Sequence, residues 1–338
     1  MGELMNGIKS FGQALLRNKG KIALIPLIAV AWIPFLFPYS DLRSVVATTL
    51  SRAMGDGTAI DFDHVALSAG FPIALELQNF EFNAPGLPPI MADRLVAKPG
   101  LSSIFTHSPA GSISAEGLFK GDVSASLTSG AKLKSGGHRQ NITADLAGIQ
   151  LSVLTDALRR AGMITFNVQG TLDTNAAVSV DPQFDEQPEG DVFVQAKTLS
   201  IPSVSIPIPN MGPVQTPSLQ MGRVEFKGKM TDGKIQVENF SFGQGKDALT
   251  GRVRGELGLM IKKDETRTQM IPGAFDLRVE LNVSKPLMDA MSKSGVALAL
   301  LIVEKYKTTV GENLKYAFRV RSTAFGAPPV FEALPVGQ

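Results

Sequence analysis

Residues 224–237 read Val-Glu-Phe-Lys-Gly-Lys-Met-Thr-Asp-Gly-Lys-Ile-Gln-Val, and this stretch decides the fold class. On both sides of Asp232-Gly233, apolar residues alternate with polar ones. Alternation at period two is typical of a half-buried β-strand. Asp-Gly is favoured in two-residue hairpin turns because both central residues need a positive φ. The stretch therefore predicts an antiparallel β-hairpin.

The same alternation recurs along most of the chain, at residues 73–78, 123–128, 166–168, 192–194, 253–261, 275–283 and 314–320. The chain also holds 33 Gly and 21 Pro, which suits a turn-rich β protein better than a helical bundle. The predicted fold class is mainly β (α+β), with large antiparallel sheets and a few short covering helices.

Three helices are predicted outside the N-terminal region. Apolar residues share one face of Asp41–Met54, and Gly55-Asp56-Gly57 ends that helix. A second, amphipathic helix spans Leu151–Arg160. A third begins near Pro286, because Ser284 is a capping residue and proline suits a first turn.

Residues 201–217 form a proline-rich stretch that cannot be a central strand, because proline donates no ladder hydrogen bond. It is predicted to be a linker or an extended edge segment. On that interpretation the exported part has two similar β units, residues 41–200 and 218–338.

Residues 22–40, Ile-Ala-Leu-Ile-Pro-Leu-Ile-Ala-Val-Ala-Trp-Ile-Pro-Phe-Leu-Phe-Pro-Tyr-Ser, carry no charge and approach the ~20 residues needed to cross a bilayer. The predicted anchor residues are Ile22, Leu24, Ile25, Leu27, Ile28, Val30, Trp32, Ile33, Phe35, Leu36 and Phe37. A cleaved signal peptide is the alternative, but its apolar region is shorter and ends in a small-x-small site. The end at Phe37-Pro38-Tyr39 favours an uncleaved transmembrane helix.

Basic residues outnumber acidic ones before the anchor, and the reverse holds after it. By the positive-inside tendency, residues 1–21 are cytoplasmic and the bulk of the chain is exported. The sequence thus predicts a single-pass protein of the inner membrane with a periplasmic β domain.

Composition excludes several classes of function. A net charge of +2 gives no electrostatic basis for binding nucleic acid. The absence of cysteine rules out disulfides, thiolate zinc sites, iron–sulfur clusters and cysteine nucleophiles.

Three short motifs mimic functional sites. Gly228 to Lys234 has the spacing of a phosphate-binding loop, but strands flank it and Ile235 replaces the magnesium-binding Ser/Thr. Gly243 to Ala248 resembles a dinucleotide fingerprint without its helix. Asp61, Asp63 and His64 fit a solvated strand edge better than a metal site. No catalytic residue, cofactor or metal is predicted, and the chain is not expected to be an enzyme.

One set of apolar residues is a candidate binding face: Phe71, Ile73, Leu75, Leu77, Phe80 and Phe82. They line a groove for acyl chains or form ordinary core, and the second interpretation has the higher prior.

Phe37-Pro38-Tyr39, the 41–54 helix, Leu67–Phe80 and the run Leu87-Pro-Pro-Ile-Met-Ala-Asp-Arg-Leu95 together resemble the type II secretion system protein N family (GspN) in its longer form. The later strands, with Gly-x-Val and Gly-x-Leu steps such as Gly251-Arg-Val, are also similar to AsmA-like proteins. The first resemblance implies an accessory or structural component of the secretion system, with no catalytic residues. The second implies a large curved sheet that forms a groove for lipid chains.

Two functions are therefore predicted. The first is an accessory component of type II secretion whose β domain contacts other components of the apparatus, through strand edges or sheet faces. The alternative is an AsmA-like groove that binds or transfers lipid between the inner and outer membranes. The expected partners are the inner membrane, other secretion components and lipid acyl chains, but no nucleic acid.

Overall fold

The structure is a computed structural model that describes residues 43–54, 57–68, 72–100, 109–134, 136–208, 212–263, 268–293, 304–311, 313–324 and 326–334. The predicted anchor at 22–40 and Phe71 lie outside the described residues. Within them, no helix is both long and apolar enough to cross a membrane.

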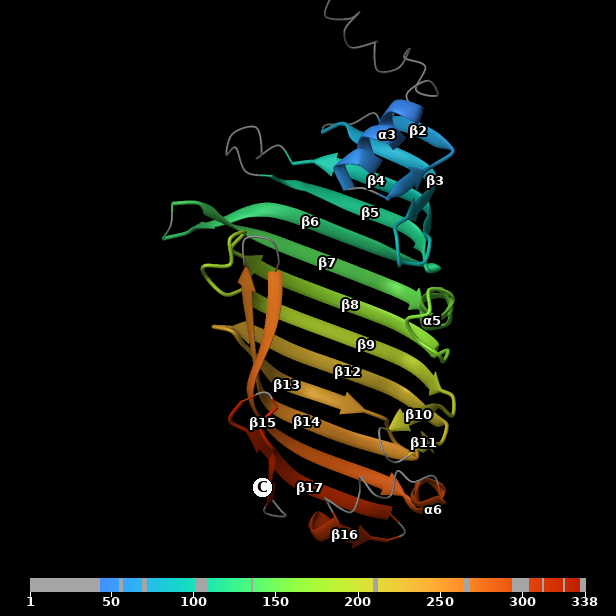
Figure 1. The fold of residues 1–338 in the computed structure, drawn as a ribbon, viewed down its shortest axis with the longest axis vertical. Coiled ribbons are helices and arrows are strands. Elements are labelled where there is room, and N and C mark those ends of the chain that lie inside the picture. The colour runs from blue at the N-terminus through green and yellow to red at the C-terminus, as the bar shows by residue number, and fades with distance from the viewer. Residues whose placement is uncertain are drawn as a thin grey trace, which may run out of the picture.

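Antiparallel strands dominate the chain, with three short α-helices and one 3-10 helix among the described residues (Figure 1). In chain order the elements are α3 (Arg43–Met54), β1 (Ala59–Asp61), β2 (His64–Ser68), β3 (Ala74–Asn83), β4 (Ile90–Pro99), β5 (Gly111–Leu118), β6 (Gly121–Lys132), β7 (His138–Gln150), α5 (Leu151–Arg160), β8 (Gln169–Val180), β9 (Glu189–Ile201), β10 (Ser205–Ile208), β11 (Gly212–Gln215), β12 (Leu219–Thr231), β13 (Lys234–Phe242), β14 (Leu249–Lys263), β15 (Thr268–Ser284), α6 (Lys285–Lys293), η2 (Glu304–Tyr306), β16 (Lys307–Val310), β17 (Asn313–Ser322) and β18 (Val330–Ala333).

One 16-stranded antiparallel sheet contains every strand except β10 and β11, and successive strands are mostly neighbours. Both edges consist of short strands, β1 and β2 at one end and β16 and β18 at the other. Short edges limit pairing with other chains. The mainly β prediction is therefore confirmed, in the form of a single sheet.

The β12–β13 hairpin has the predicted two-residue turn. Thr231 pairs with Lys234, and Asp232 and Gly233 have φ values of 50° and 69°. Positive φ at both central residues is the type I′ geometry that Asp-Gly favours. The phosphate-loop spacing of residues 228–234 is thus part of a hairpin.

The three predicted helices are α3, α5 and α6, at the predicted places. The run from Val296 to Val303 that follows α6 lies outside the described residues.

The proline-rich stretch leaves the sheet as a separate hairpin, β10–β11, while β9 and β12 on either side of it pair directly. The two predicted β units are therefore adjacent halves of one sheet. The prolines show from local sequence that the strands are interrupted here. The pairing of β9 with β12 joins residues on either side of this interruption, so local sequence does not reveal it.

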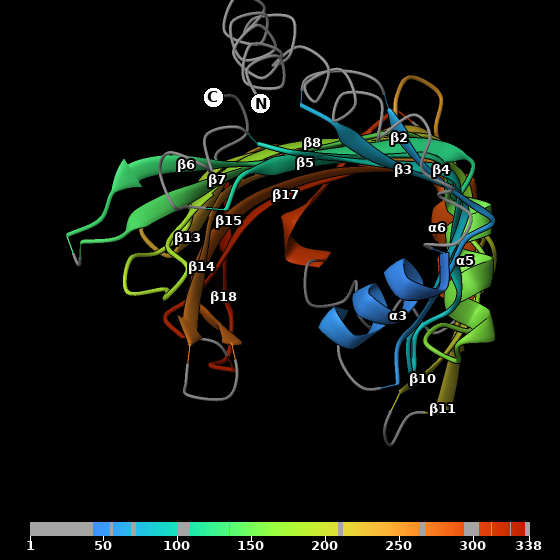
Figure 2. The same ribbon diagram turned by 90° about the horizontal axis from the view of Figure 1, so that it is seen from above.

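The sheet is strongly curved: seen along its length in Figure 2, the strands form an arch with α3 on the concave side. Register shifts accompany residues with positive φ, including Gly117, Gly148 and Gly170. Such bulges bend a strand and increase its twist. At Gly255, with a φ of 141°, a Cβ would lie 2.0 Å from the Asp276 carbonyl oxygen, so only glycine fits.

The β14–β15 hairpin extends past the main sheet and is held to the β8–β9 loop. Gln187 donates from Nε2 to the Ile261 carbonyl at 2.9 Å, and its Oε1 accepts from the Ile261 N–H at 2.8 Å. This pair of hydrogen bonds fixes one side of the arch.

The β8–β9 loop contains the buried carboxylate of Asp181, which is 1% exposed. It accepts hydrogen bonds from the Gln183 and Glu186 N–H groups, each at 3.0 Å. Arg139 Nη1 donates to Glu186 Oε2 at 2.9 Å and braces the same loop. Burial alone would raise the pKa of Asp181, but the backbone hydrogen bonds and Arg139 outweigh it and hold the pKa below its usual value.

We expect Asp181→Asn to lower the free energy of unfolding by about 1.5–3 kcal/mol at pH 7, the usual range for hydrogen bonds to a charged group. Because the folded pKa is depressed, the carboxylate stabilises fully above the unfolded pKa of ~3.9, and this contribution is lost as pH falls through the folded pKa. Urea unfolding at pH 7 and near pH 3 measures the difference. Asp185→Asn, on the same loop but exposed, is the control, with an expected change within ~0.5 kcal/mol. If Asp181→Asn lowered the free energy of unfolding equally at both pH values, the proposed role of the Asp181 carboxylate would be wrong.

Candidate functional site

An unbroken row of directly paired residues crosses the sheet, and all but one of them are apolar. Directly paired residues of antiparallel strands lie on the same face. The first row consists of Leu77, Leu95, Ala115, Val123, Leu146, Thr174, Val194, Phe226, Phe240, Val253, Val279 and Phe318.

Two further rows run beside the first. The second row consists of Leu75, Ala97, Ile113, Ala125, Ala144, Ala176, Val192, Gly228, Val237, Gly255, Leu277 and Val320. The third consists of Leu127, Ile142, Val178, Gly190, Met230, Ile235, Leu257 and Phe275. We call the three rows the apolar face. Alanine or glycine occupies six of the twelve positions in the second row.

The apolar face is on the concave side of the arch. Leu77, at one end of the first row, packs in a cluster with Val46 and Leu50 of α3. Figure 2 shows α3 inside the arch, so the rows that continue from Leu77 line the inside as well.

Buried side chains concentrate at the two ends of this face, although Ala115 and Val237 are also buried between them. Buried clusters occur around Leu77 at the α3 end and around Phe318 at the other end. Between them most large side chains are half-buried, while Ile113 and Ile142 are 44% and 39% exposed. The described helices pack mainly on β1, β7, β8, β15 and β17. The contacts of α5 are at the ends of β7 and β8, where Thr155 bonds to Asn167 and Val168, and not at the row residues 142–146 and 174–178. No described helix therefore packs on the rows between β5 and β14.

The uncovered section is large for a soluble surface. At ~4.8 Å per strand it is about 34 Å long, and at ~6.8 Å between rows the three rows span about 14 Å. This gives an area on the order of 500 Å², comparable to the largest apolar patches of soluble monomers, which are often functional.

The opposite, convex face is polar, and several of its charges form ion pairs. Arg94 Nε lies 2.8 Å from Glu76 Oε1, Lys227 Nζ lies 2.7 Å from Glu238 Oε2, and Arg319 pairs with Asp276. Hydrogen bonds from Arg94 and Arg319 hold the pKa values of Glu76 and Asp276 below their usual values. This face has the character of an ordinary solvated surface.

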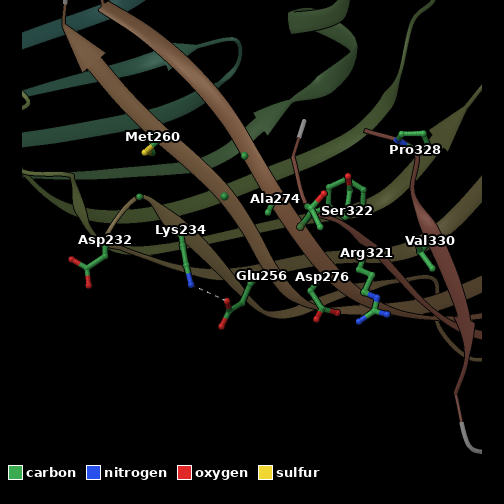
Figure 3. Close-up of a pocket in the computed structure, with 15 residues that line it drawn as sticks. Asp232, Lys234, Glu256, Met260, Ala274, Asp276, Arg321, Ser322, Pro328 and Val330 are labelled. Atoms are coloured by element: carbon green, nitrogen blue, oxygen red, sulfur yellow. Dashed lines mark ion pairs between the residues drawn. The ribbon is translucent and has the colours of Figure 1, made fainter. Parts of the chain in front are cut away.

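A depression of about 910 Å³ lies at the bend of the β14–β15 hairpin. Figure 3 shows Lys234, Glu256, Asp276 and Arg321 pointing to one side of the ribbon there. Lys234 Nζ lies 3.5 Å from Glu256 Oε2, Asp276 is paired with Arg319, and Arg321 is paired with Glu332. Its charges are therefore matched within the protein, and it is a weaker candidate than the apolar face.

Of the six residues predicted as a candidate face, Leu75 and Leu77 belong to the apolar face, at its α3 end. Leu77 is 1% exposed, and Leu75, Phe80 and Phe82 pack against its cluster, whereas Ile73 is 46% exposed. Asn79 has a φ of 50°, outside the β region, and Phe80 and Phe82 after it pack on the same cluster as Leu77, although the register with β4 does not shift. Sequence reasoning missed the later rows, although it found alternation in several of the strands that carry them, including β6, β9 and β12–β15.

The three acidic and imidazole side chains near residue 61 do not converge. Asp61 accepts a hydrogen bond from Arg43 at 2.9 Å, and Asp63 accepts one from Asn79 at 2.7 Å. His64 is an exposed residue of β2 that pairs with Gln78.

Comparison of the chain with protein-family models, with curated proteins and with solved structures finds no match. No relative's function therefore transfers to this protein, and its candidate function rests on the apolar face.

Proposed function

We propose that the apolar face binds the acyl chains of lipids, and that the protein binds or transfers lipid in the bacterial cell envelope. The observation that carries this proposal is the uncovered, continuous apolar surface on the inside of the arch. The proposal requires no catalytic residue.

The chemistry of the face favours acyl chains over a peptide in extended conformation. Its side chains offer almost no hydrogen-bonding groups, and a sheet face, unlike a sheet edge, presents no free backbone groups. An extended peptide would lose the hydration of its backbone without gaining partners, which costs several kcal/mol for each unpaired group. An acyl chain has no such groups to satisfy.

The dimensions of the face also suit lipid. The uncovered length of about 34 Å is close to the ~30 Å hydrocarbon thickness of a bilayer. Two acyl chains laid end to end would therefore fill it.

The predicted anchor complements this proposal. Residues 22–40 precede α3 directly in the sequence, and α3 lies at one end of the apolar face. An inner-membrane anchor would hold that end next to a lipid source, with the β domain in the periplasm.

Paired reporters on β9 test the proposal. Val194 belongs to the first row, and Gln195 is its neighbour on the convex side. Because the chain has no cysteine, Val194→Cys and Gln195→Cys can each be labelled with one fluorophore in the full-length protein in nanodiscs. We expect a spin-labelled stearate to quench the Val194 label saturably and at least about threefold more strongly than the Gln195 label, because a spin label quenches only at short range. Equal quenching at both positions, or none at Val194, would refute acyl-chain binding on this face.

A further inference from the structure

Both ends of the apolar face are closed by elements of the same chain. At the C-terminal end the ring of Tyr306 in η2 stacks on Phe318, where the first row reaches β17, with a centroid distance of 5.9 Å and an interplanar angle of 27°. The ring of Phe331 in β18 also packs on the Phe318 ring, with 5.9 Å between the two ring centroids. Tyr306 Oη donates a hydrogen bond to the Phe331 carbonyl oxygen at 2.6 Å. This Tyr306–Phe318–Phe331 cluster closes the first row at β17.

At the other end α3 lies across β1 and β3. Its residues Val46, Ala47 and Leu50 pack against the cluster that contains Leu77. The helix is fixed by Ser51, whose Oγ accepts from the Ile60 N–H at 3.0 Å. Arg43 adds an ion pair with Asp61 at 2.9 Å, between side chains that are 46% and 66% exposed.

We propose that the apolar face is a compartment with two closed ends, loaded across its open long side, and not a channel through which lipid passes from end to end. This inference rests on the proposed function and specifies how that site is filled. A chain that slid along the rows would meet Tyr306 at one end and α3 at the other. Between the two ends, by contrast, Ile113 and Ile142 are 44% and 39% exposed, so the rows can be reached there without passing Tyr306 or α3.

The two closed ends limit the number of acyl chains that the apolar face can hold. The uncovered section of about 34 Å admits roughly two acyl chains end to end, given a bilayer core of ~30 Å. Occupancy should therefore saturate at a fixed number of chains. A channel open at both ends would also let a bound chain reach beyond Phe318.

The C-terminal closure is tested by a reporter beyond Phe318. Ala333 is an exposed residue of β18 that pairs with Phe318 on the side away from β15. With a fluorophore on Ala333→Cys, we expect the spin-labelled stearate to quench weakly while Tyr306 is present. Tyr306→Ala should raise the quenching at least about threefold by removing the ring. Tyr306→Phe, which keeps the ring and loses only the hydrogen bond to Phe331, should leave it unchanged. Strong quenching in the presence of Tyr306, or no increase for Tyr306→Ala, would overturn closure at this end.

The α3 closure is tested by fixing the helix in place. Arg43→Cys and Asp61→Cys can be joined by a short bis-maleimide that replaces the ion pair in the full-length protein. We expect stearate to load at the same rate, within about twofold, before and after cross-linking, because loading across the side needs no movement of α3. A tenfold or greater slowing would show that α3 is the entrance and would overturn the proposal.

The reporter on Val194 distinguishes a failure of acyl-chain binding from a failure of the closed-end proposal. If stearate does not quench the Val194 label in the uncross-linked protein, acyl-chain binding itself is refuted. If it does, the Tyr306 and cross-linking results concern only the route of loading.

Discussion

Replacing Ala176 by glutamate is expected to weaken acyl-chain binding at least about tenfold, while the same change at Ala177 leaves binding unaltered. The two alanines are neighbours on β8 but face opposite sides. Ala176 pairs with Ala144 and Val192 in the middle of the apolar face, and Ala177 pairs with Thr143 and Asp191 on the polar one.

The physical reason is the cost of placing a carboxylate among acyl chains. A charged residue at the centre of a membrane costs about 2.5–3.5 kcal/mol on insertion scales, and each 1.4 kcal/mol corresponds to a tenfold change in affinity. On an open face the glutamate side chain can turn towards water, which relieves part of this cost. We therefore expect affinity to fall at least about tenfold. Ala176 is not fully buried, so the variant should still fold.

Titration with the spin-labelled stearate, read from the Val194 label, measures both variants. Far-ultraviolet circular dichroism and thermal unfolding should agree between Ala176→Glu and Ala177→Glu. Equal weakening by both substitutions would mean that net charge, and not the apolar face, controls binding.

Leu77→Ala is expected to give the largest loss of stability, about 2–5 kcal/mol, because a fully buried leucine leaves a cavity that its surroundings fill only in part. Leu77 of β3 is 1% exposed and packs in one cluster with Ile60 of β1, Val65 of β2 and Leu50 of α3. The loss should be concentrated at the α3 end, because the sheet beyond β5 is stabilised mainly by pairing between its own strands.

Hydrogen exchange of the α3, β1 and β3 amides measures this local effect, together with thermal unfolding. Leu87→Ala is the matched control, since Leu87 is 46% exposed, and a surface substitution usually changes stability by less than ~0.5 kcal/mol. Uniformly faster exchange across β12–β15 after Leu77→Ala would show that the sheet unfolds as one unit and would contradict a locally stabilised end.

The accessory role in type II secretion stays a prediction from resemblance, beside the lipid proposal. The two differ in phenotype. A deletion strain that loses exoprotein release while lipid asymmetry stays intact would favour secretion, whereas disturbed lipid asymmetry with normal release would favour lipid handling.

Local features of the sequence were sufficient to predict many of the individual helices, strands and turns. Asp232-Gly233 specified its turn because few residue pairs accept positive φ at both positions. The α5 helix followed from apolar spacing within Leu151–Arg160, and period-two alternation marked β3, β6, β9, β12–β15 and β17. The alternation at 166–168 was wrong, because these residues lie before β8 and form no strand. All of these signals act between residues close in the chain.

The apolar face was decided only by tertiary structure. Alternation shows that Val194 and Phe226 each lie on an apolar side of a strand, but it does not show that they pair across the proline-rich stretch. Strand pairing brings together residues that are far apart in sequence. A slip of one residue in the register would turn all side chains of a strand to the other face. The period also breaks at Asn79: its φ of 50° lies outside the β region, and Phe80 packs on the same cluster as Leu77, three residues before it. Side-chain alternation alone could not reveal this backbone conformation.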